Sequence, residues 1–312
     1  MSTAALPVLE VLPRDLSAYA AGNTGIPYVH RFGSGRPGPH VLVNALTHGN
    51  ELCGAVAASR LLDDGVRPRI GTLTIAFANV AAYESFDPAR PFDSRQLVHN
   101  LNRVWSPEWL DGDEDGPELR RARELRPVVA AADHVLDLHS TSQDVEPFWV
   151  YPARAPNAEV ALAIGRPSVH LVMPSGLGSG TPLIEHGRFG VAGSDAGAAL
   201  VAECGQHFRR ATCELAVEVA LDVLGHFGLI ERAPGGAARA PQRRYELIRT
   251  HVVRTPDFRF ARPLVGFETF EADEPIAVDG DAELRAPEAC TVLMPTREPI
   301  VGREGFYLAR AL

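Results

Sequence analysis

The chain has 312 residues, of which 46% are hydrophobic and 22% are charged, and its formal net charge at pH 7 is −9. The length predicts one large domain with a smaller one, and the apolar content is enough for a sizeable core. The acidic balance and the scattered basic residues argue against nucleic acid or an anionic membrane as partner. Every basic residue is an arginine, and the absence of lysine excludes Schiff-base, pyridoxal phosphate and P-loop chemistry.

The cysteines are too few and too irregularly spaced for a disulfide framework or a Cys-x-x-Cys metal site. They predict free thiols in a reducing compartment; they are Cys53, Cys204, Cys213 and Cys290. Residues 1–20 contain charged positions and no uninterrupted apolar core, so we expect no signal peptide, no membrane span and a cytoplasmic location.

Apolar runs and helical patterns alternate along residues 41–227. This alternation predicts an α/β fold, with a mostly parallel sheet covered by helices on both faces. The expected strands are 41–46, 73–79, 134–138 and 198–203, and the expected helices are 51–62, 118–131 and 212–227.

The composition changes at residues 231–244, which are rich in Ala, Gly, Pro and Arg. We predict a catalytic domain over 1–230, a linker over 231–244, and a small all-β domain over 245–312, where short β-like segments are broken by Pro, Gly and Asp.

The motif THGNE places His48 and Glu51 three residues apart at the expected start of a helix. Side chains at this spacing share a helix face and can converge on one cation. DLHST delivers a third candidate ligand, His139, at the end of an apolar strand. Two histidines and a carboxylate with one position left for water form a recurrent catalytic zinc set, although a lone His at a strand end is more often structural. Asp137 could orient a ligand imidazole or be a buried, hydrogen-bonded strand carboxylate.

These candidates fall where ligand sites form in such sheets. Parallel α/β sheets bind ligands just beyond the carboxyl ends of their strands. His48, His139 and Glu203 all lie at predicted strand ends, so we expect them to share one site.

THGNE, then LNR about fifty residues later, then DLHST, then a Glu-x-Gly after a late strand, appear in this order from His48 to Glu203. In this pattern the chain resembles the succinylglutamate desuccinylase and aspartoacylase family, relatives of zinc carboxypeptidases. The resemblance implies a zinc-carboxypeptidase-like catalytic domain followed by a small C-terminal β domain.

Carried over by motif, the resemblance implies that one Zn²⁺ is bound by His48, Glu51 and His139. It further implies that Glu203 is the general base and that Arg95 polarises the scissile carbonyl. Asn102 and Arg103 would hold the α-carboxylate of the substrate.

The chain also departs from the family pattern. Members that act on N-acetylaspartate carry a further arginine about ten positions before the catalytic Glu, where this chain has Gly193, so an acidic substrate side chain is not expected. The family's usual Asp before the Asn-Arg pair is Asn100, which we interpret as a tolerated structural change. His207 is interpreted as structural, with a proton shuttle or pocket wall as alternatives, and the glycine-rich segment 173–190 as either a flap or a flexible loop.

Together these features predict a zinc-dependent amidohydrolase that cleaves the amide bond of a small N-acyl amino acid. Zinc would acidify a water, Glu203 would move its proton, and Arg95 would stabilise the oxyanion. The alternatives are a zinc carboxypeptidase acting on short peptides and a metal-binding protein without catalysis. The sequence leaves the acyl group, the amine and a homo-oligomeric state open.

Overall fold

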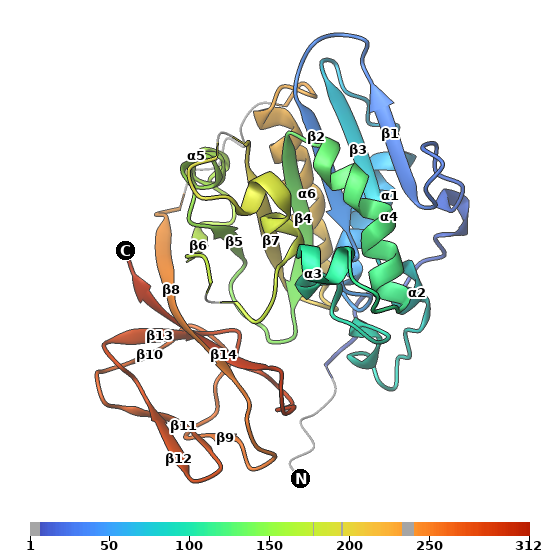
Figure 1. Ribbon diagram of the computed structural model, residues 1–312. Coiled ribbons are helices and arrows are strands. Elements are labelled where there is room, and N and C mark those ends of the chain that lie inside the picture. Colours follow the sequence, from blue (N-terminus) through green and yellow to red (C-terminus); the bar gives the residue numbers. More distant parts are fainter. Residues whose placement is uncertain (1–6, 177, 195, 233–239) are drawn as a thin grey trace.

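An 11-stranded mixed sheet runs through the whole protein, with strand order β1-β3-β2-β4-β7-β5-β6-β8-β14-β13-β10 (Figure 1). The computed structural model describes residues 7–176, 178–194, 196–232 and 240–312. Parallel pairing joins β3, β2, β4 and β7, and it also joins β5, β6 and β8. The strands are β1 Val29–Gly33, β2 His40–Ala45, β3 Thr72–Phe77, β4 His134–Thr141, β5 Phe148–Pro152, β6 Val169–Met173, β7 Ala199–Gln206, β8 Arg243–Val252, β10 Glu268–Phe270, β13 Cys290–Leu293 and β14 Glu304–Ala311.

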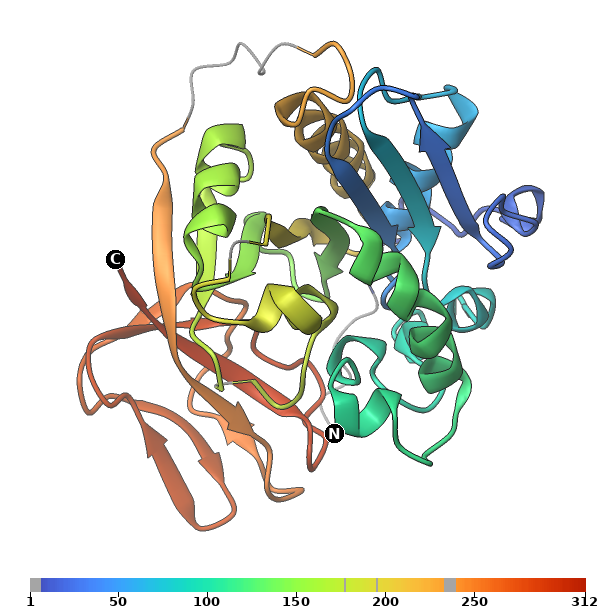
Figure 2. The same cartoon turned by 45° about the horizontal axis from the view of Figure 1, so that its top comes forward.

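Helices cover both faces of the N-terminal two thirds of this sheet (Figures 1 and 2). On one face lie α1 (Leu52–Asp63), α5 (Ala155–Ile164) and α6 (Arg210–His226), which share a core cluster. The opposite face is covered by α4 (Pro117–Ala131). Shorter helical segments are η1 Ser17–Tyr19, α2 Val80–Glu84, η2 Asp93–Arg95, η3 Leu101–Arg103, α3 Pro107–Leu110, η4 Leu183–Glu185 and η5 Gly187–Gly190.

The two faces explain why the central strands are apolar along their length. In β2, Val41 and Val43 pack into the cluster beneath α1 and α6, whereas Leu42 packs into the cluster beneath α4. Strands that are buried on both faces have no need of polar alternation. The predicted α/β class is confirmed, and the expected strands and helices lie within a few residues of their observed positions.

The C-terminal strands extend the same sheet and add a smaller one. β8 pairs in parallel with β6 and antiparallel with β14. The second sheet contains β9 (Arg259–Phe260), β11 (Pro275–Asp279) and β12 (Ala282–Arg285), and it encloses a separate core cluster. Residues 233–239 of the predicted linker lie outside the described residues, and the domain boundaries stay a prediction.

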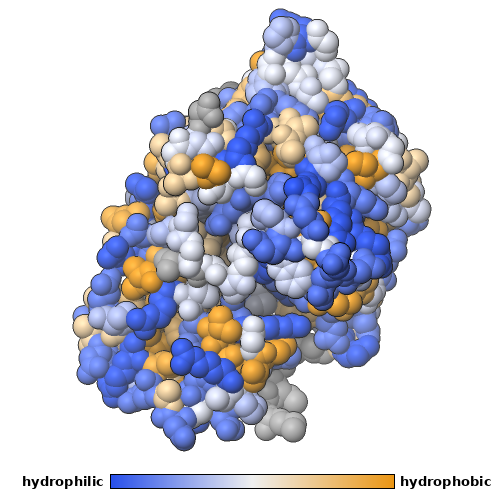
Figure 3. Space-filling view, viewed as in Figure 1, coloured by the Kyte–Doolittle hydropathy of each residue, from blue (hydrophilic) through white to orange (hydrophobic). Residues whose placement is uncertain are grey.

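The surface in Figure 3 is mostly hydrophilic, with small and separate hydrophobic patches. Among the described residues, the helices are all too short or too polar to cross a lipid bilayer.

An ion pair ties the C-terminal strands to η3. Arg103 donates to Glu304 from Nε at 3.1 Å and from Nη2 at 2.6 Å, and Nη2 also donates to the Tyr307 hydroxyl at 3.1 Å. The side chains of Arg103 and Glu304 are 22% and 20% exposed, so solvent screens this pair less than a surface pair. Burial opposes ionisation of Glu304, but the Arg103 guanidinium lowers the pKa of that carboxyl to about 2.

This pKa predicts an acid-sensitive contribution to stability. The pKa of Glu304 lies below its ordinary value of 4.5, so the contribution is complete above about pH 4.5 and is lost as the pH falls toward 2. We expect wild type to lose about 2 kcal/mol more stability between pH 7 and pH 3 than Glu304→Gln. Urea unfolding at both pH values measures this difference.

Glu246→Gln is the matched control, because Glu246 pairs with Arg310, whose side chain is half exposed. If wild type and Glu304→Gln lose the same free energy of unfolding between pH 7 and pH 3, the ion pair of Arg103 with Glu304 does not contribute to stability.

Candidate functional site

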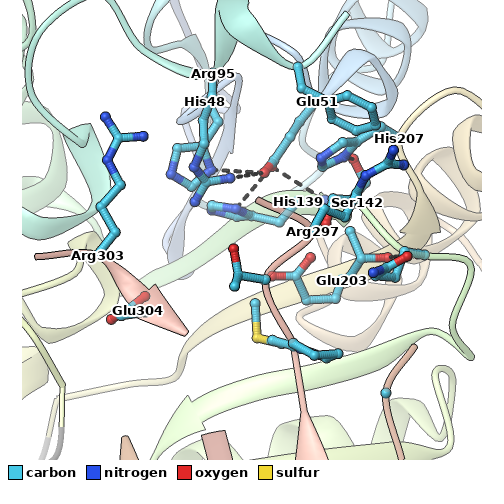
Figure 4. Close-up of a pocket in the computed structure, with 18 of the residues that line it drawn as sticks. His48, Glu51, Arg95, His139, Ser142, Glu203, His207, Arg297, Arg303 and Glu304 are labelled. Carbon is cyan, nitrogen blue, oxygen red and sulfur yellow. Dashed lines mark hydrogen bonds and ion pairs between the residues drawn. The ribbon is translucent and has the colours of Figure 1, made fainter. Parts of the chain in front are cut away.

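A cavity of about 450 Å³ opens at the carboxyl ends of β2, β4 and β7. His48, His139 and Glu203 line it from these strand ends, and C-terminal residues that include Met294, Arg297 and Glu304 form another part of its wall. Figure 4 shows the side chains of His48, Glu51, Arg95 and His139 gathered at one end of this cavity. His48, His139 and Glu203, which come from distant motifs, therefore lie together at one edge of the sheet, as predicted.

The turn between β2 and α1 positions the first two candidate ligands. Its first residue, Leu46, has a φ of 60°, and the chain then turns through Gly49. A Cβ at Gly49 would lie 2.4 Å from the Ala82 carbonyl carbon and from the Ser94 carbonyl oxygen, so only glycine fits.

The geometry corrects one step of the sequence argument. Helix α1 begins at Leu52, and Glu51 is the residue before it. His48 and Glu51 therefore converge through the turn and not across a helix face.

Glu51 lies between two imidazoles. His48 Nδ1 is 2.8 Å from Glu51 Oε1, and His139 Nδ1 is 3.0 Å from Glu51 Oε2. The side chains are between 1% and 3% exposed, and one donor atom from each residue lies within 4.8 Å of the others. The structure thus brings all three predicted ligands together at the bottom of the cavity.

The far nitrogen of each imidazole is also held. His139 Nε2 lies 2.8 Å from Asp137 Oδ2, and His48 Nε2 lies 3.0 Å from Asn100 Oδ1. Each Nδ1 faces Glu51, so a neutral imidazole that is protonated on Nε2 would offer its Nδ1 lone pair to a cation shared with the Glu51 carboxylate. Asp137 is itself bound by Asn44 and Thr47, so it both orients His139 and is part of a buried hydrogen-bond network.

The donor set suits a divalent cation. Two neutral imidazole nitrogens, one carboxylate and outer hydrogen bonds to both imidazoles are the arrangement found in catalytic zinc sites. Burial disfavours the imidazolium of His139, but the carboxylates of Asp137 and Glu51 raise its pKa well above its ordinary value. A proton therefore balances these buried carboxylates in the absence of a cation, and a metal ion would take its place.

Glu203 lies on β7, in register with His139 on β4. Its carboxyl is buried, and Oε2 has no hydrogen-bond partner among the described residues. Burial raises the pKa of Glu203 to about 8. A buried, unpaired carboxyl beside a cation site is suited to exchanging protons with a water or a substrate.

Arg95 and His207 lie at the rim of the cluster. Arg95 Nη1 donates to Glu51 Oε1 at 3.4 Å, and its side chain is 37% exposed. His207 Nδ1 lies 2.8 Å from Ser140 Oγ. Burial lowers the pKa of His207 to about 3, so His207 is a neutral part of the cavity wall.

The remaining predicted residues, Asn102 and Arg103, line the same cavity. The Asn102 carboxamide oxygen accepts the Leu183 N–H at 3.0 Å, which leaves its NH₂ group for a ligand. Arg103 is more constrained than expected, because Glu304 and Tyr307 engage Nε and Nη2. Nη1 donates one bond, to the Asn102 carbonyl oxygen.

Sequence reasoning missed the residues that support this set. Asn100 was interpreted as a tolerated change, yet its amide oxygen keeps the acceptor that His48 needs. Glu304 and Tyr307 follow the ligand motifs by more than 160 positions, and no local pattern connects them to Arg103.

Comparison with known proteins gives a family match over part of the chain. Residues 37–175 match the succinylglutamate desuccinylase/aspartoacylase catalytic domain, which confirms the resemblance for the stretch that contains THGNE, LNR and DLHST. Glu203 lies beyond this stretch.

One curated relative is the N-acyl-aromatic-L-amino acid amidohydrolase (carboxylate-forming) of Xenopus laevis. It is 32% identical over 118 residues, which are 35% of this chain and 36% of the relative. The chain thus matches about a third of that relative's length.

Solved structures resemble nearly the whole chain. Succinylglutamate desuccinylase from Vibrio parahaemolyticus has a TM-score of 0.68 at 18% identity, covering 92% of this chain and 86% of that one. The enzyme from Vibrio cholerae has a TM-score of 0.68 at 20% identity, with coverages of 91% and 86%. These likenesses establish the zinc-carboxypeptidase-like fold with a C-terminal β region.

The support of His139 by Asp137 generates a prediction about metal affinity. Asp137→Asn removes the charged acceptor that orients the imidazole, so we expect zinc to bind roughly 10- to 100-fold more weakly. Competition with a chromogenic chelator measures the change. Asp113→Asn, in an exposed loop, is the control, and an unchanged affinity in Asp137→Asn would rule out the orienting role.

Proposed function

We propose that the chain is a zinc-dependent amidohydrolase that cleaves the amide bond of a small N-acyl amino acid. The observation that carries the proposal is the unpaired, buried Glu203 carboxyl beside the His48, Glu51 and His139 cluster. A site that only stored a metal ion would have no use for a free carboxyl at this position. The match of residues 37–175 to a family of deacylases supports the same reaction class.

A zinc ion held by His48, Glu51 and His139 would supply a Lewis acid and make a nearby water acidic at neutral pH. Glu203 accepts the proton of the attacking water and later delivers it to the leaving nitrogen. A carboxyl group suits this double role, because as a carboxylate it takes the proton from the water and as the neutral acid it returns the proton to the nitrogen.

Arg95 is the cationic group placed to stabilise the developing oxyanion. It contacts Glu51 and is still 37% exposed, so its guanidinium can also reach a substrate carbonyl above the cluster. Donors of this kind are worth about 3 kcal/mol in the transition state.

We propose that Asn102 and Arg103 bind the α-carboxylate of the substrate. Each has an N–H group that no bond to the described residues uses: the Asn102 NH₂ and one hydrogen on Arg103 Nη1. The bond from Nη1 to the Asn102 carbonyl oxygen and the ion pair with Glu304 hold the guanidinium in place, which reduces the ordering cost of binding.

Cleavage of short peptides is the second enzymatic candidate. Residues of the segment from Met294 to Glu304 form part of the cavity wall, and this wall favours small substrates over an extended peptide. Comparing N-acetyl amino acids with dipeptides and tripeptides distinguishes the two activities.

Glu203→Gln tests the proposed function directly. The amide keeps the shape of the side chain but cannot accept the proton, so we expect kcat to fall by roughly 10²- to 10⁴-fold while zinc content stays at one ion per chain. Deacylation of an N-acetyl amino acid panel and elemental analysis measure the two quantities.

Glu214→Gln is the matched control, because Glu214 lies on α6 and does not line the cavity. Full activity in Glu203→Gln would rule out Glu203 as the base. A zinc-loaded wild type that hydrolyses none of the panel would favour a metal-binding protein without catalysis.

A further inference from the structure

A second, smaller cavity of about 60 Å³ lies beyond Glu203, and Glu203, Asn102 and Arg103 line both cavities. Its wall is mostly apolar and comes from β5, β6, β7 and the segment around η4. The apolar side chains are Val150, Leu171, Met173, Ile184 and Val201. This wall suits methylene groups and not a carboxylate or a sugar.

One carboxyl group of the second cavity has no cation paired with it. The guanidinium of Arg103 is neutralised by Glu304. Glu185 also lines the cavity, and no ion pair or hydrogen bond of its carboxyl is found among the described residues. Burial raises the pKa of Glu185, and Arg103 offsets this only in part. Glu185 therefore lacks the cationic partner that a half-buried carboxylate needs.

The position of Glu203 decides which half of a substrate enters this cavity. Glu203 must reach the scissile nitrogen in order to return the proton, so the released amino acid lies beside Glu203. Asn102 and Arg103, proposed to hold its α-carboxylate, border both cavities. The side chain of that amino acid then extends into the second cavity, and the acyl group stays in the first.

We infer that the second cavity binds a short alkyl side chain ending in an ammonium group, which pairs with Glu185. The inference rests on the proposed function and specifies its substrate class as N-acyl derivatives of short basic amino acids. The methylene groups contact the apolar wall and the ammonium group supplies the missing cation.

The volume limits the length of the side chain. A water-sized group needs about 10–15 Å³ in this measure, so a cavity of about 60 Å³ holds roughly four to six non-hydrogen atoms. Ornithine, with three methylenes and an amine, has this size.

The experiment compares three substrates with the full-length, zinc-loaded protein. Nα-acetyl-L-ornithine is the test substrate, N-acetyl-L-norleucine is its neutral isostere, and N-acetyl-L-glutamate is the acidic counterpart. We expect kcat/KM for the ornithine substrate to exceed that for the other two by tenfold or more. In Glu185→Gln, the ratio of ornithine to norleucine kcat/KM should fall by roughly 10- to 100-fold, as expected for loss of a charged hydrogen bond.

Glu159→Gln removes an equal charge from the exposed side of α5 and should keep the wild-type ratio. Wild type that prefers norleucine or glutamate, or a ratio that survives in Glu185→Gln, would overturn the assignment of the cavity and leave the amidohydrolase function standing. If zinc-loaded wild type hydrolyses no N-acyl amino acid of any class, the proposed function is wrong and this inference falls with it. The comparison among wild-type substrates does not depend on how any variant folds.

Discussion

Glu51 is a fully buried carboxylate with an imidazole nitrogen on each side, at 2.8 Å and 3.0 Å. Burying this charge together with Asp137 is costly unless a cation compensates for it. Burial opposes ionisation of Glu51, yet the two imidazoles hold its pKa well below its ordinary value. The protein thus maintains a preformed set of metal-binding atoms. The hydrogen bonds that both imidazoles donate to Asp137 and Asn100 fix the rings in the orientation that a metal ion requires.

The sheet brings these groups together from distant parts of the chain. Parallel register places His139 on β4 beside Glu203 on β7, and the turn after β2 adds His48 and Glu51. The C-terminal strands then close the cavity, because β14 carries Glu304 to Arg103. Since β8 pairs with β6, this C-terminal wall is attached to the same sheet as the ligands, and the distance between the two walls is set by strand pairing.

Much of the fold and the main site residues could be predicted from the sequence, for identifiable physical reasons. Strands such as β2 and β4 are apolar runs that end in chemically distinctive motifs, and parallel sheets concentrate such ends at one edge. β5 was not anticipated: its sequence FWVYP favours a strand, but it is short and has proline at its end and immediately before it, and proline weakens a strand assignment. The spacing of His48 and Glu51 pointed to a shared ligand set, although a turn and not a helix face brings them together.

Other features depend on contacts that no local pattern reveals. The pairing of Arg103 with Glu304 joins residues 201 positions apart, and the unpaired state of Glu185 becomes visible only when its cavity is formed. The role of Asn100 was also difficult to predict. Asn100 accepts a hydrogen bond from His48, and an amide oxygen can do this as well as a carboxylate. Residues that act through an acceptor atom are harder to recognise from sequence than residues that act through their charge.

The central claim is that His48, Glu51 and His139 bind one metal ion. X-ray absorption at the zinc edge, combined with elemental analysis of the purified full-length chain, tests it most directly. The structure predicts one zinc per chain, coordinated by two imidazole nitrogens and by oxygen. A protein that retains no stoichiometric ion after exposure to zinc, or a spectrum dominated by sulfur from the buried cysteines, would contradict this account.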